Sequence, residues 1–397
     1  MPAFSDTLKP TERWDVINYL HELASAPTAI PLSALPAPSP PAATVTPSRD
    51  ATSAPQGPTQ PLGRIIFGPD GDKNFWVLTL PDKPERLTNF GPLDFTSSPV
   101  WSPDGRQVAF SYYQLPSANT AVPPGTDLYL MNTDGTGVHM LAAHDVPGAA
   151  LQTPAWAPDS SAVYVSYRLQ GASLIAGADR IDVTSGARTR VMPNAGYPSL
   201  SRDGQRLAYV RLPSPELRGE TLWWSKPDGS EPHQILGLKV FDRYVNVRVA
   251  PDSQRVLFAA VGNGKRYQAP TTGGLDLLVL LGQMLDVPAA HADGSVPWDF
   301  WTINFDGSDL RRLTTLAEDL PVGAWSPDGS YVAFLGGGSF TTSQTGLGVL
   351  GVDGSGLRRL TSQAGHRGVD WAPPLPPQSE APLPWARQSA PPGDART

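Results

Sequence analysis

Short runs of alternating hydrophobic and polar residues recur along most of this chain, and a common turn motif introduces them. After the SPDG sequence that starts at Ser102, apolar Val108 and Phe110 alternate with polar or small neighbours. An alternation with a period of two predicts a β-strand with one richer apolar face. Serine, proline and glycine at the first, second and fourth places of the motif favour a type I β-turn. The pattern therefore predicts short strands joined by tight turns.

The unit recurs along the chain, with an aromatic or other apolar residue directly before the turn. A second strand, a D-G turn and a third strand follow each copy. The five copies read VWSPDGRQVAF from Val100, AWAPDSSAVYV from Ala155, SLSRDGQRLAYV from Ser199, RVAPDSQRVLFA from Arg248 and AWSPDGSYVAFL from Ala324. Repeats of about 40–55 residues with several short strands each are typical of propeller blades. We expect Trp101, Trp156 and Trp325 of this motif to pack between neighbouring blades.

The two ends of the repeat region complete one further blade. The sequence from Leu62 supplies three strands but lacks the aromatic-led first strand. GVDWAPP from Gly368 supplies that strand, with Trp371 at the aromatic place. The chain is therefore predicted to form an all-β, six-bladed β-propeller that its C-terminal strand closes.

Proline-rich segments flank the repeats. Residues 24–61 are predicted to form a semi-rigid linker and residues 374–397 a disordered tail, because extended proline-rich sequence buries no core. The predicted organisation is an N-terminal segment over 1–23, the linker over 24–61, the propeller over 62–373 and the tail.

Composition excludes several classes of protein. The net charge is −7, so the chain lacks the basic surface that nucleic-acid binding requires. The chain has no cysteine, which excludes disulfides, thiolate nucleophiles and a covalent c-type haem attachment within this sequence. An apolar run of about 18 residues is also missing, so we expect no transmembrane segment.

The repeated motif resembles the TolB-like, WD-like propeller repeat family over about four-fifths of the chain. Two copies depart from it, because Arg202 replaces the proline of the third copy and the fourth copy lacks the tryptophan. The resemblance implies a module that binds proteins or peptides at the rim or at the channel mouth. Some related propellers are accessory domains of peptidases.

The first 23 residues carry a second resemblance. MPAFSDTLKPTERWDVINYLHEL looks like the C-terminal end of a class I cytochrome c domain. A helix is predicted from about Pro10 to Leu23, since Trp14, Ile17 and Leu20 form an apolar stripe at helical spacing. The resemblance implies that Met1 is an axial haem ligand, although no C-x-x-C-H sequence is present.

Two explanations of this segment stay open. In the first, the native protein continues upstream into a haem c domain, and the chain is extracytoplasmic or periplasmic, where c-type haem is attached. In the second, the segment is a relic without haem. The preserved spacing of the MPAF and RWDV motifs favours the first, and in neither case do we expect a cofactor within this chain.

Five aspartates share one place in the turn motif and are the most regular candidates for chemistry. A ring of carboxylates could hold a metal, but a common place within a turn favours a structural role. These aspartates are Asp104, Asp159, Asp203, Asp252 and Asp328.

Catalytic signatures are weak. The six histidines are scattered and form no pair such as H-x-H or H-E-x-x-H. A serine hydrolase needs a G-x-S-x-G elbow, which the sequence lacks. We expect a non-catalytic protein, and the alternative is a lyase- or lactonase-type propeller enzyme with a metal in its channel.

An insertion within the fifth blade, residues 263–297, is a candidate docking element. It contains GGLDLLVLLGQMLDVP, which is too short to cross a bilayer. It is either a packed extension of the blade or a partner-docking element, because long insertions of a repeat often carry binding. The candidate docking residues are Leu275, Leu277, Leu278, Leu281 and Met284.

Basic pairs occur in equivalent strands at Arg311-Arg312 and Arg358-Arg359. They could face an acidic partner, but solvated outer-strand positions explain them as well. The prediction as a whole is a monomeric binding or scaffold propeller with a protein or peptide partner, natively joined to a haem electron carrier.

Overall fold

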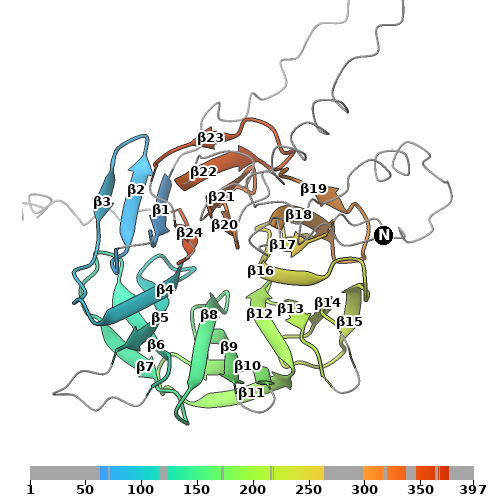
Figure 1. The fold of residues 1–397 in the computed structure, drawn as a ribbon, viewed down its shortest axis with the longest axis horizontal. Helices are drawn as coiled ribbons and strands as arrows, with labels where there is room; N and C mark the ends of the chain where they lie inside the picture. The colour runs from blue at the N-terminus through green and yellow to red at the C-terminus, as the bar shows by residue number, and fades with distance from the viewer. Residues whose placement is uncertain are drawn as a thin grey trace, which may run out of the picture. The chain divides into compact units, whose positions relative to one another are not determined.

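The computed structural model describes the propeller region of the chain and contains only β-strands within the described ranges (Figure 1). These ranges are residues 63–69, 72–115, 124–170, 174–214, 217, 219–262, 298–315, 320–336, 346–362, 365 and 367–374. Six four-stranded antiparallel sheets are arranged as blades around a common centre. The predicted all-β, six-bladed propeller is confirmed.

In each blade the strands are ordered from the centre outward. Blade 1 contains β24 (Val369–Trp371), β1 (Gly63–Phe67), β2 (Trp76–Leu80) and β3 (Pro84–Arg86). Blade 2 contains β4 (Asp94–Trp101), β5 (Gln107–Gln114), β6 (Asp127–Asn132) and β7 (His139–Ala142). Blade 3 contains β8 (Ala149–Trp156), β9 (Ala162–Gln170), β10 (Leu174–Asp182) and β11 (Arg188–Pro193).

The second half of the ring follows the same plan. Blade 4 contains β12 (Ala195–Leu200), β13 (Leu207–Arg211), β14 (Thr221–Ser225) and β15 (His233–Leu236). Blade 5 contains β16 (Arg243–Val249), β17 (Arg255–Val261), β18 (Trp298–Asn304) and β19 (Arg311–Arg312). Blade 6 contains β20 (Val322–Trp325), β21 (Tyr331–Gly336), β22 (Gly346–Gly351) and β23 (Arg358–Arg359).

The C-terminal strand closes the ring as predicted. β24 pairs antiparallel with β1, with Ile65 opposite Trp371 and Ile66 opposite Asp370. The last described strand of the chain is thus the innermost strand of blade 1, next to the first described strand (Figure 1).

Four inner strands carry a β-bulge at the same place. In β4, β8, β12 and β16 the pairing register shifts by an extra residue, and the residue at the shift has a positive φ. These residues are Ser98 (φ 54°), Thr153 (48°), Tyr197 (55°) and Asn246 (54°). A bulge bends its strand and redirects the neighbouring side chains. The bulges therefore set how each inner strand presents its last residues to the centre.

Tryptophans of the motif pack against the preceding blade. Trp156 of blade 3 lies in a core cluster with Val100 and Leu128 of blade 2, and its Nε1 donates to the Val100 carbonyl at 3.1 Å. Trp325 of blade 6 lies with Val245 and Leu257 of blade 5. Its Nε1 donates to the Arg248 carbonyl, also at 3.1 Å. Burial of these large side chains and of their N–H groups holds neighbouring blades together.

Several predictions concern residues outside the described ranges. They are the helix and haem contact of residues 1–23, including Met1, the linker over 24–61, and the tail beyond residue 374. The insertion over 263–297, with its candidate docking residues, also lies outside these ranges. In the described part of the chain, no helix is long and apolar enough to span a membrane.

Candidate functional site

Six equivalent residues, one from each inner strand, lie directly before the aromatic place of the motif. Four of them are small or neutral, and two are charged. In blade order from blade 1 they are Asp370, Val100, Ala155, Ser199, Arg248 and Ala324. A positive and a negative charge have therefore been introduced at the same place of the repeat in blades 5 and 1, on either side of blade 6.

A cavity of about 390 Å³ lies beside these charges, at the end of the inner strands where the SPDG-type turns begin. Every blade contributes its residue from the aromatic place and its residue from the proline place. The aromatic-place residues are Trp371, Trp101, Trp156, Leu200, Val249 and Trp325, and the proline-place residues are Pro373, Pro103, Pro158, Arg202, Pro251 and Pro327. The wall is thus mostly apolar and aromatic, with Arg202, Arg248 and Asp370 as its charged members.

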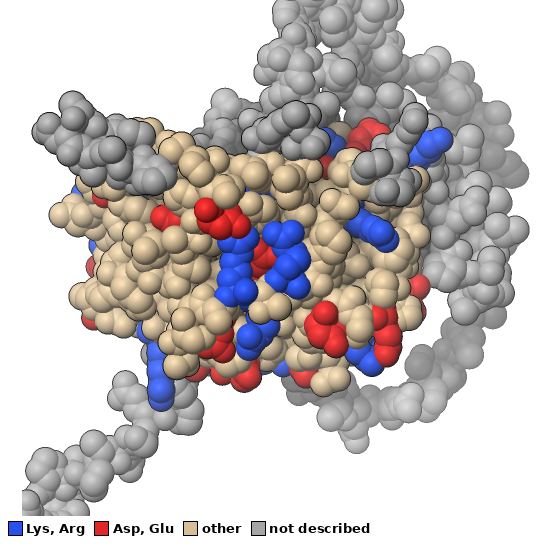
Figure 2. All heavy atoms as spheres, turned by 90° about the horizontal axis from the view of Figure 1, so that it is seen from below, with Lys and Arg blue, Asp and Glu red and all other residues tan. Residues whose placement is uncertain are grey.

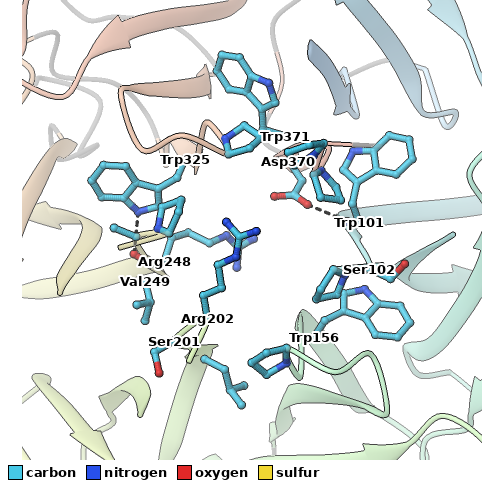
Figure 3. A pocket seen from close by; sticks show the side chains of 18 residues that line it. Trp101, Ser102, Trp156, Ser201, Arg202, Arg248, Val249, Trp325, Asp370 and Trp371 are labelled. Atoms are coloured by element: carbon cyan, nitrogen blue, oxygen red, sulfur yellow. Dashed lines mark hydrogen bonds between the residues drawn. The ribbon is translucent and has the colours of Figure 1, made fainter. Parts of the chain in front are cut away.

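Arg248 points into this cavity from β16 (Figure 3). Its Nε is buried and has no hydrogen-bond partner in the structure. The Trp325 indole fixes the backbone of Arg248 through its carbonyl, as described above. Burial lowers the pKa of Arg248, and the nearby carboxylate of Asp370 acts in the opposite direction. Arg248 as a whole is half-buried, but buried guanidinium nitrogens are normally hydrogen-bonded, so the unpaired Nε leaves binding capacity unused.

Asp370 faces the same cavity from β24 (Figure 3). Its Oδ2 accepts a hydrogen bond from the Trp101 backbone N–H at 2.7 Å. Burial raises the pKa of Asp370 to about 6, against the opposing effects of Arg248 and of the Trp101 N–H. Ser199 makes the equivalent contact in blade 4, where its Oγ accepts from the Val249 N–H at 2.9 Å.

The two charges do not form a salt bridge. No nitrogen–oxygen contact within 4.0 Å joins Arg248 to Asp370, although each influences the pKa of the other. Arg202, an exposed residue of the turn in blade 4, also points toward the space between them in Figure 3. Two guanidinium groups and one carboxylate therefore border the same open space.

A second cavity, of about 370 Å³, lies beyond Arg248, which lines both. Its wall includes the four bulge residues, together with Gln152 and Leu320. The bulges thus shape a second chamber with mostly neutral polar and apolar walls, and Arg248 lies between the two chambers.

The tryptophans predicted as blade-motif residues all line the first cavity. Trp101, Trp156, Trp325 and Trp371 are each less than about a tenth exposed, so they offer edges and not open faces. The cavity thus combines a rigid aromatic wall with a few charged groups.

The five repeated aspartates hold their own turns. Asp104 accepts from Ser102 Oγ at 2.6 Å, and Asp252 accepts from the Gln254 N–H at 2.8 Å. Asp159 accepts from the Ser161 N–H at 3.0 Å, and the hydrogen bonds of Ser161 lower its pKa. Asp203 and Asp328 accept from Ser201 Oγ and Ser326 Oγ, each at 2.5 Å. None of the five lines either described cavity.

Metal-ligating groups do not gather within the described ranges. There, no group of three or more His, Cys, Asp or Glu side chains lies close enough together to hold a metal ion. His144 forms a pair with Asp127 at 2.6 Å, whereas His233 stacks on Trp224. His21, His291 and His366 lie outside the described residues.

One of the basic pairs is engaged with acidic groups. In blade 5, Arg311 pairs with Asp309 at 2.6 Å and Arg312 with Asp299 at 2.7 Å. Arg358 and Arg359 form β23, the outermost strand of blade 6.

Sequence reasoning missed the three charged residues of the cavity as a site. Arg202 and the absence of a tryptophan after Arg248 are visible in the sequence as departures from the repeat, but the departures alone do not show that these residues line one cavity. Aligning the residue before the aromatic place would have identified Arg248 and Asp370, because the other four copies have small or neutral residues there.

Comparisons with known proteins identify the fold. No family model and no curated protein matches this chain. TolB from Acinetobacter baumannii has a similar structure, with a TM-score of 0.53 and 14% identity over 78% of this chain and 67% of that chain. A putative TolB from Agrobacterium tumefaciens has a TM-score of 0.38 and 16% identity over 62% of this chain and 91% of that chain.

An oligogalacturonate lyase from Vibrio parahaemolyticus has a TM-score of 0.44 and 14% identity, covering 73% of this chain and 71% of that chain. Identities this low establish a shared fold and no shared activity. The similarity to the Acinetobacter TolB, together with the observed ring of six blades, shows that this chain has the fold of the TolB-type six-bladed β-propellers.

Proposed function

We propose that this propeller is a non-catalytic binding module, and that an anionic group of a peptide or protein ligand enters the cavity at the turn end of its channel. The observation that carries the proposal is Arg248, whose Nε is buried and has no hydrogen-bond partner. A guanidinium group presents several donors in a planar fork that suits a carboxylate. A ligand carboxylate would accept the hydrogen bond that Arg248 Nε does not make within the protein.

The remaining wall supports a peptide ligand. Tryptophan edges and proline rings surround the charged groups, so an apolar or proline-containing segment can contact the wall while its carboxylate reaches Arg248. Arg202 adds a second positive charge at the exposed side of the cavity. Asp370 balances Arg248 in the free protein, and its high pKa lets it take up a proton when a second anion enters.

The hydroxyl groups of the cavity favour binding over nucleophilic catalysis. Ser102 and Ser201 line the cavity, but each donates its hydroxyl to an aspartate of its own turn, Asp104 and Asp203. A nucleophilic serine needs a neighbouring general base that takes up its proton while the serine oxygen attacks a substrate. The propeller enzyme with a channel metal stays the alternative hypothesis.

The link to electron transfer is a further part of the proposal. It rests on the resemblance of residues 1–23 to the end of a cytochrome c domain, and with it the protein would position a haem carrier outside the cytoplasm. The intact mass and visible spectrum of the protein from its native source test this part. A larger mass with a Soret band is expected, whereas a mass matching this chain without a chromophore would rule the fusion out.

Titration with short peptides tests the channel site. The probe is fluorescein-labelled Ala-Pro-Glu with a free carboxylate, and labelled Ala-Pro-Gln-amide is the uncharged control. We expect the charged probe to bind and Arg248→Gln to weaken it at least about tenfold, because a desolvated charge pair is lost. Arg106→Gln, an exposed residue of an equivalent turn in blade 2, is the matched control and should leave binding unchanged. Equal affinity in the Arg248 variant and the wild type would refute the site.

A further inference from the structure

Two arginines share one buried carboxylate at the outer edge of blade 3. Asp179, in β10, is 1% exposed at its side chain, and its Oδ2 accepts from Arg188 Nε at 2.7 Å. Its Oδ1 accepts from Arg190 Nε. Both arginines belong to β11, the outermost strand of the blade, so the two guanidinium groups are held side by side at the rim.

Packing fixes the orientation of both groups. The guanidinium carbons of Arg188 and Arg190 lie 4.6 and 4.8 Å from the centroid of the Tyr167 ring. Arg190 also lies across Gly177, where an added Cβ would come within 2.6 Å of Arg190 Nη1. The stacking and the missing side chain at Gly177 let Arg190 lie flat against the sheet. The two side chains are therefore ordered before any partner arrives, which lowers the entropic cost of binding.

The two arginines of this cluster share one carboxylate, unlike those of blade 5. There, the buried Asp299 pairs with Arg312 at 2.7 Å and accepts the Thr314 hydroxyl at 2.8 Å, while Arg311 turns to Asp309. In blade 3 both arginines use the same carboxylate, and the nearby Asp145 supplies the second negative charge at 3.5 Å from Arg188 Nη2.

The two guanidinium groups are accessible. The hydrogen bonds to Asp179 are made by the Nε atoms, and the side chains of Arg188 and Arg190 are 20% and 37% exposed. Arg190 makes no other hydrogen bond to the residues that the structure describes. Asp145 approaches Arg188 Nη2 at 3.5 Å, but 52% of its side chain is exposed.

Figure 2 shows the side of the ring on which β11 lies in Figure 1. Basic and acidic side chains gather near the middle of this face, and most of the surrounding surface is neutral. A charged partner that approaches this side therefore meets a compact charged cluster.

We propose that Arg188 and Arg190 form a docking site for an acidic side chain of a partner protein, separate from the channel cavity. A partner carboxylate displaces Asp145 from Arg188 and bridges the terminal nitrogens of the two arginines. Planar guanidinium groups bind a carboxylate through two parallel hydrogen bonds, so the site selects the orientation of the carboxylate as well as its charge. Once Asp145 is displaced, the two arginines and Asp179 together carry one positive charge. A carboxylate neutralises this charge, whereas a phosphate dianion exceeds it, so a carboxylate is favoured over a phosphate.

Fluorescence anisotropy with a defined peptide tests this proposal. The probe is a fluorescein-labelled peptide of four Val-Glu repeats, the uncharged control has four Val-Gln repeats, and a phosphoserine peptide with the same spacing tests the alternative anion. We expect the Glu peptide to bind more tightly than both others, and Arg190→Gln to weaken it about fivefold. Arg311→Gln removes an exposed arginine of the outer strand of blade 5 and should have no effect.

Two further variants separate docking from a structural role. Asp145→Asn removes the competing carboxylate and should tighten binding severalfold, a gain that loss of structure cannot produce. Gly177→Ala keeps every charge but pushes Arg190 out of its position, and it should weaken binding as Arg190→Gln does. Unchanged affinity in Asp145→Asn and Gly177→Ala would overturn the proposal, as would tighter binding of the phosphoserine peptide. Arg248→Gln should not alter this binding, so failure here and failure of the channel site are distinguishable.

Discussion

Arg248 and Asp370 occupy the same place of the blade repeat, two blades apart, and face one cavity without forming a salt bridge. A salt bridge would satisfy both groups and close the space between them. Their separation instead leaves a half-buried arginine without a salt bridge and a carboxylate whose pKa is raised to about 6.

Asp370 should make the stability of the protein depend on pH. Its pKa is about 6 in the folded protein against an ordinary value of 3.8, so below pH 4 it is protonated in both states and costs nothing. As the pH rises from 4 to 6 the unfolded chain ionises first, and the free energy of unfolding falls by up to about 3 kcal/mol. Above pH 6 the loss stays constant.

Asp370→Asn should remove this loss while its side-chain oxygen still accepts from Trp101 N–H. Urea denaturation from pH 4 to 8 gives the free energy of unfolding of the variant and of the wild type. The difference between the two values isolates Asp370, because the other titrating groups are the same in both proteins. Parallel stability curves for the two proteins would contradict the assignment.

Ligand affinity at the channel cavity should rise on acidification. Protonation of Asp370 below about pH 6 removes the negative charge beside Arg248, so a carboxylate ligand meets less repulsion. The dissociation constant of Ala-Pro-Glu should therefore be lower at pH 5.5 than at pH 7.5. In Asp370→Asn it should be low at both values. A wild-type affinity that is independent of pH would show that Asp370 does not face the bound anion.

Two tryptophans offer a matched pair of substitutions. Trp325→Phe and Trp156→Phe each remove a 3.1 Å hydrogen bond to a carbonyl of the preceding blade and leave a small cavity. Both should lower the free energy of unfolding by about 1–3 kcal/mol. Both tryptophans line the cavity, but only Trp325→Phe also releases the backbone of Arg248, so this variant should weaken ligand binding more than Trp156→Phe does. Equal effects of both variants on affinity would mean that Trp325 does not position Arg248.

The aspartates of the turn motif should affect stability and not binding. Asp159→Ala removes the acceptor for the Ser161 N–H and hydroxyl, at 3.0 and 2.7 Å, and should destabilise the protein by about 1 kcal/mol. Thermal unfolding and the peptide titration on the same sample give both quantities. Lost binding with unchanged stability would instead show that Asp159 contacts the ligand.

The rim site of blade 3 should respond to salt more steeply than the channel site does. Arg190 is 37% exposed, so salt screens its attraction for a partner carboxylate more strongly than it screens that of the half-buried Arg248. Raising the ionic strength from about 20 to 200 mM should weaken the Val-Glu peptide severalfold and Ala-Pro-Glu less. The opposite order would indicate that the rim peptide binds at an enclosed position.

The repeat could be predicted from the sequence alone. The period-two alternation and the turn chemistry at each SPDG-type motif act locally, so they predict strands and turns without knowledge of the distant chain. Recurrence of the motif, and the match of the strand at Trp371 to the blade that begins near Leu62, then predicted six blades and their closure. Even the turn role of Asp104 and its equivalents followed from residue preference alone.

The site was decided by the tertiary structure. Arg248 and Asp370 are far apart in the chain, and only closure of the ring brings them to one cavity, at a distance that forbids a salt bridge. The sharing of Asp179 by two arginines likewise depends on strand register and on the missing side chain at Gly177. Local patterns specify each strand, but which charges are buried, paired or left without a partner depends on how the blades meet.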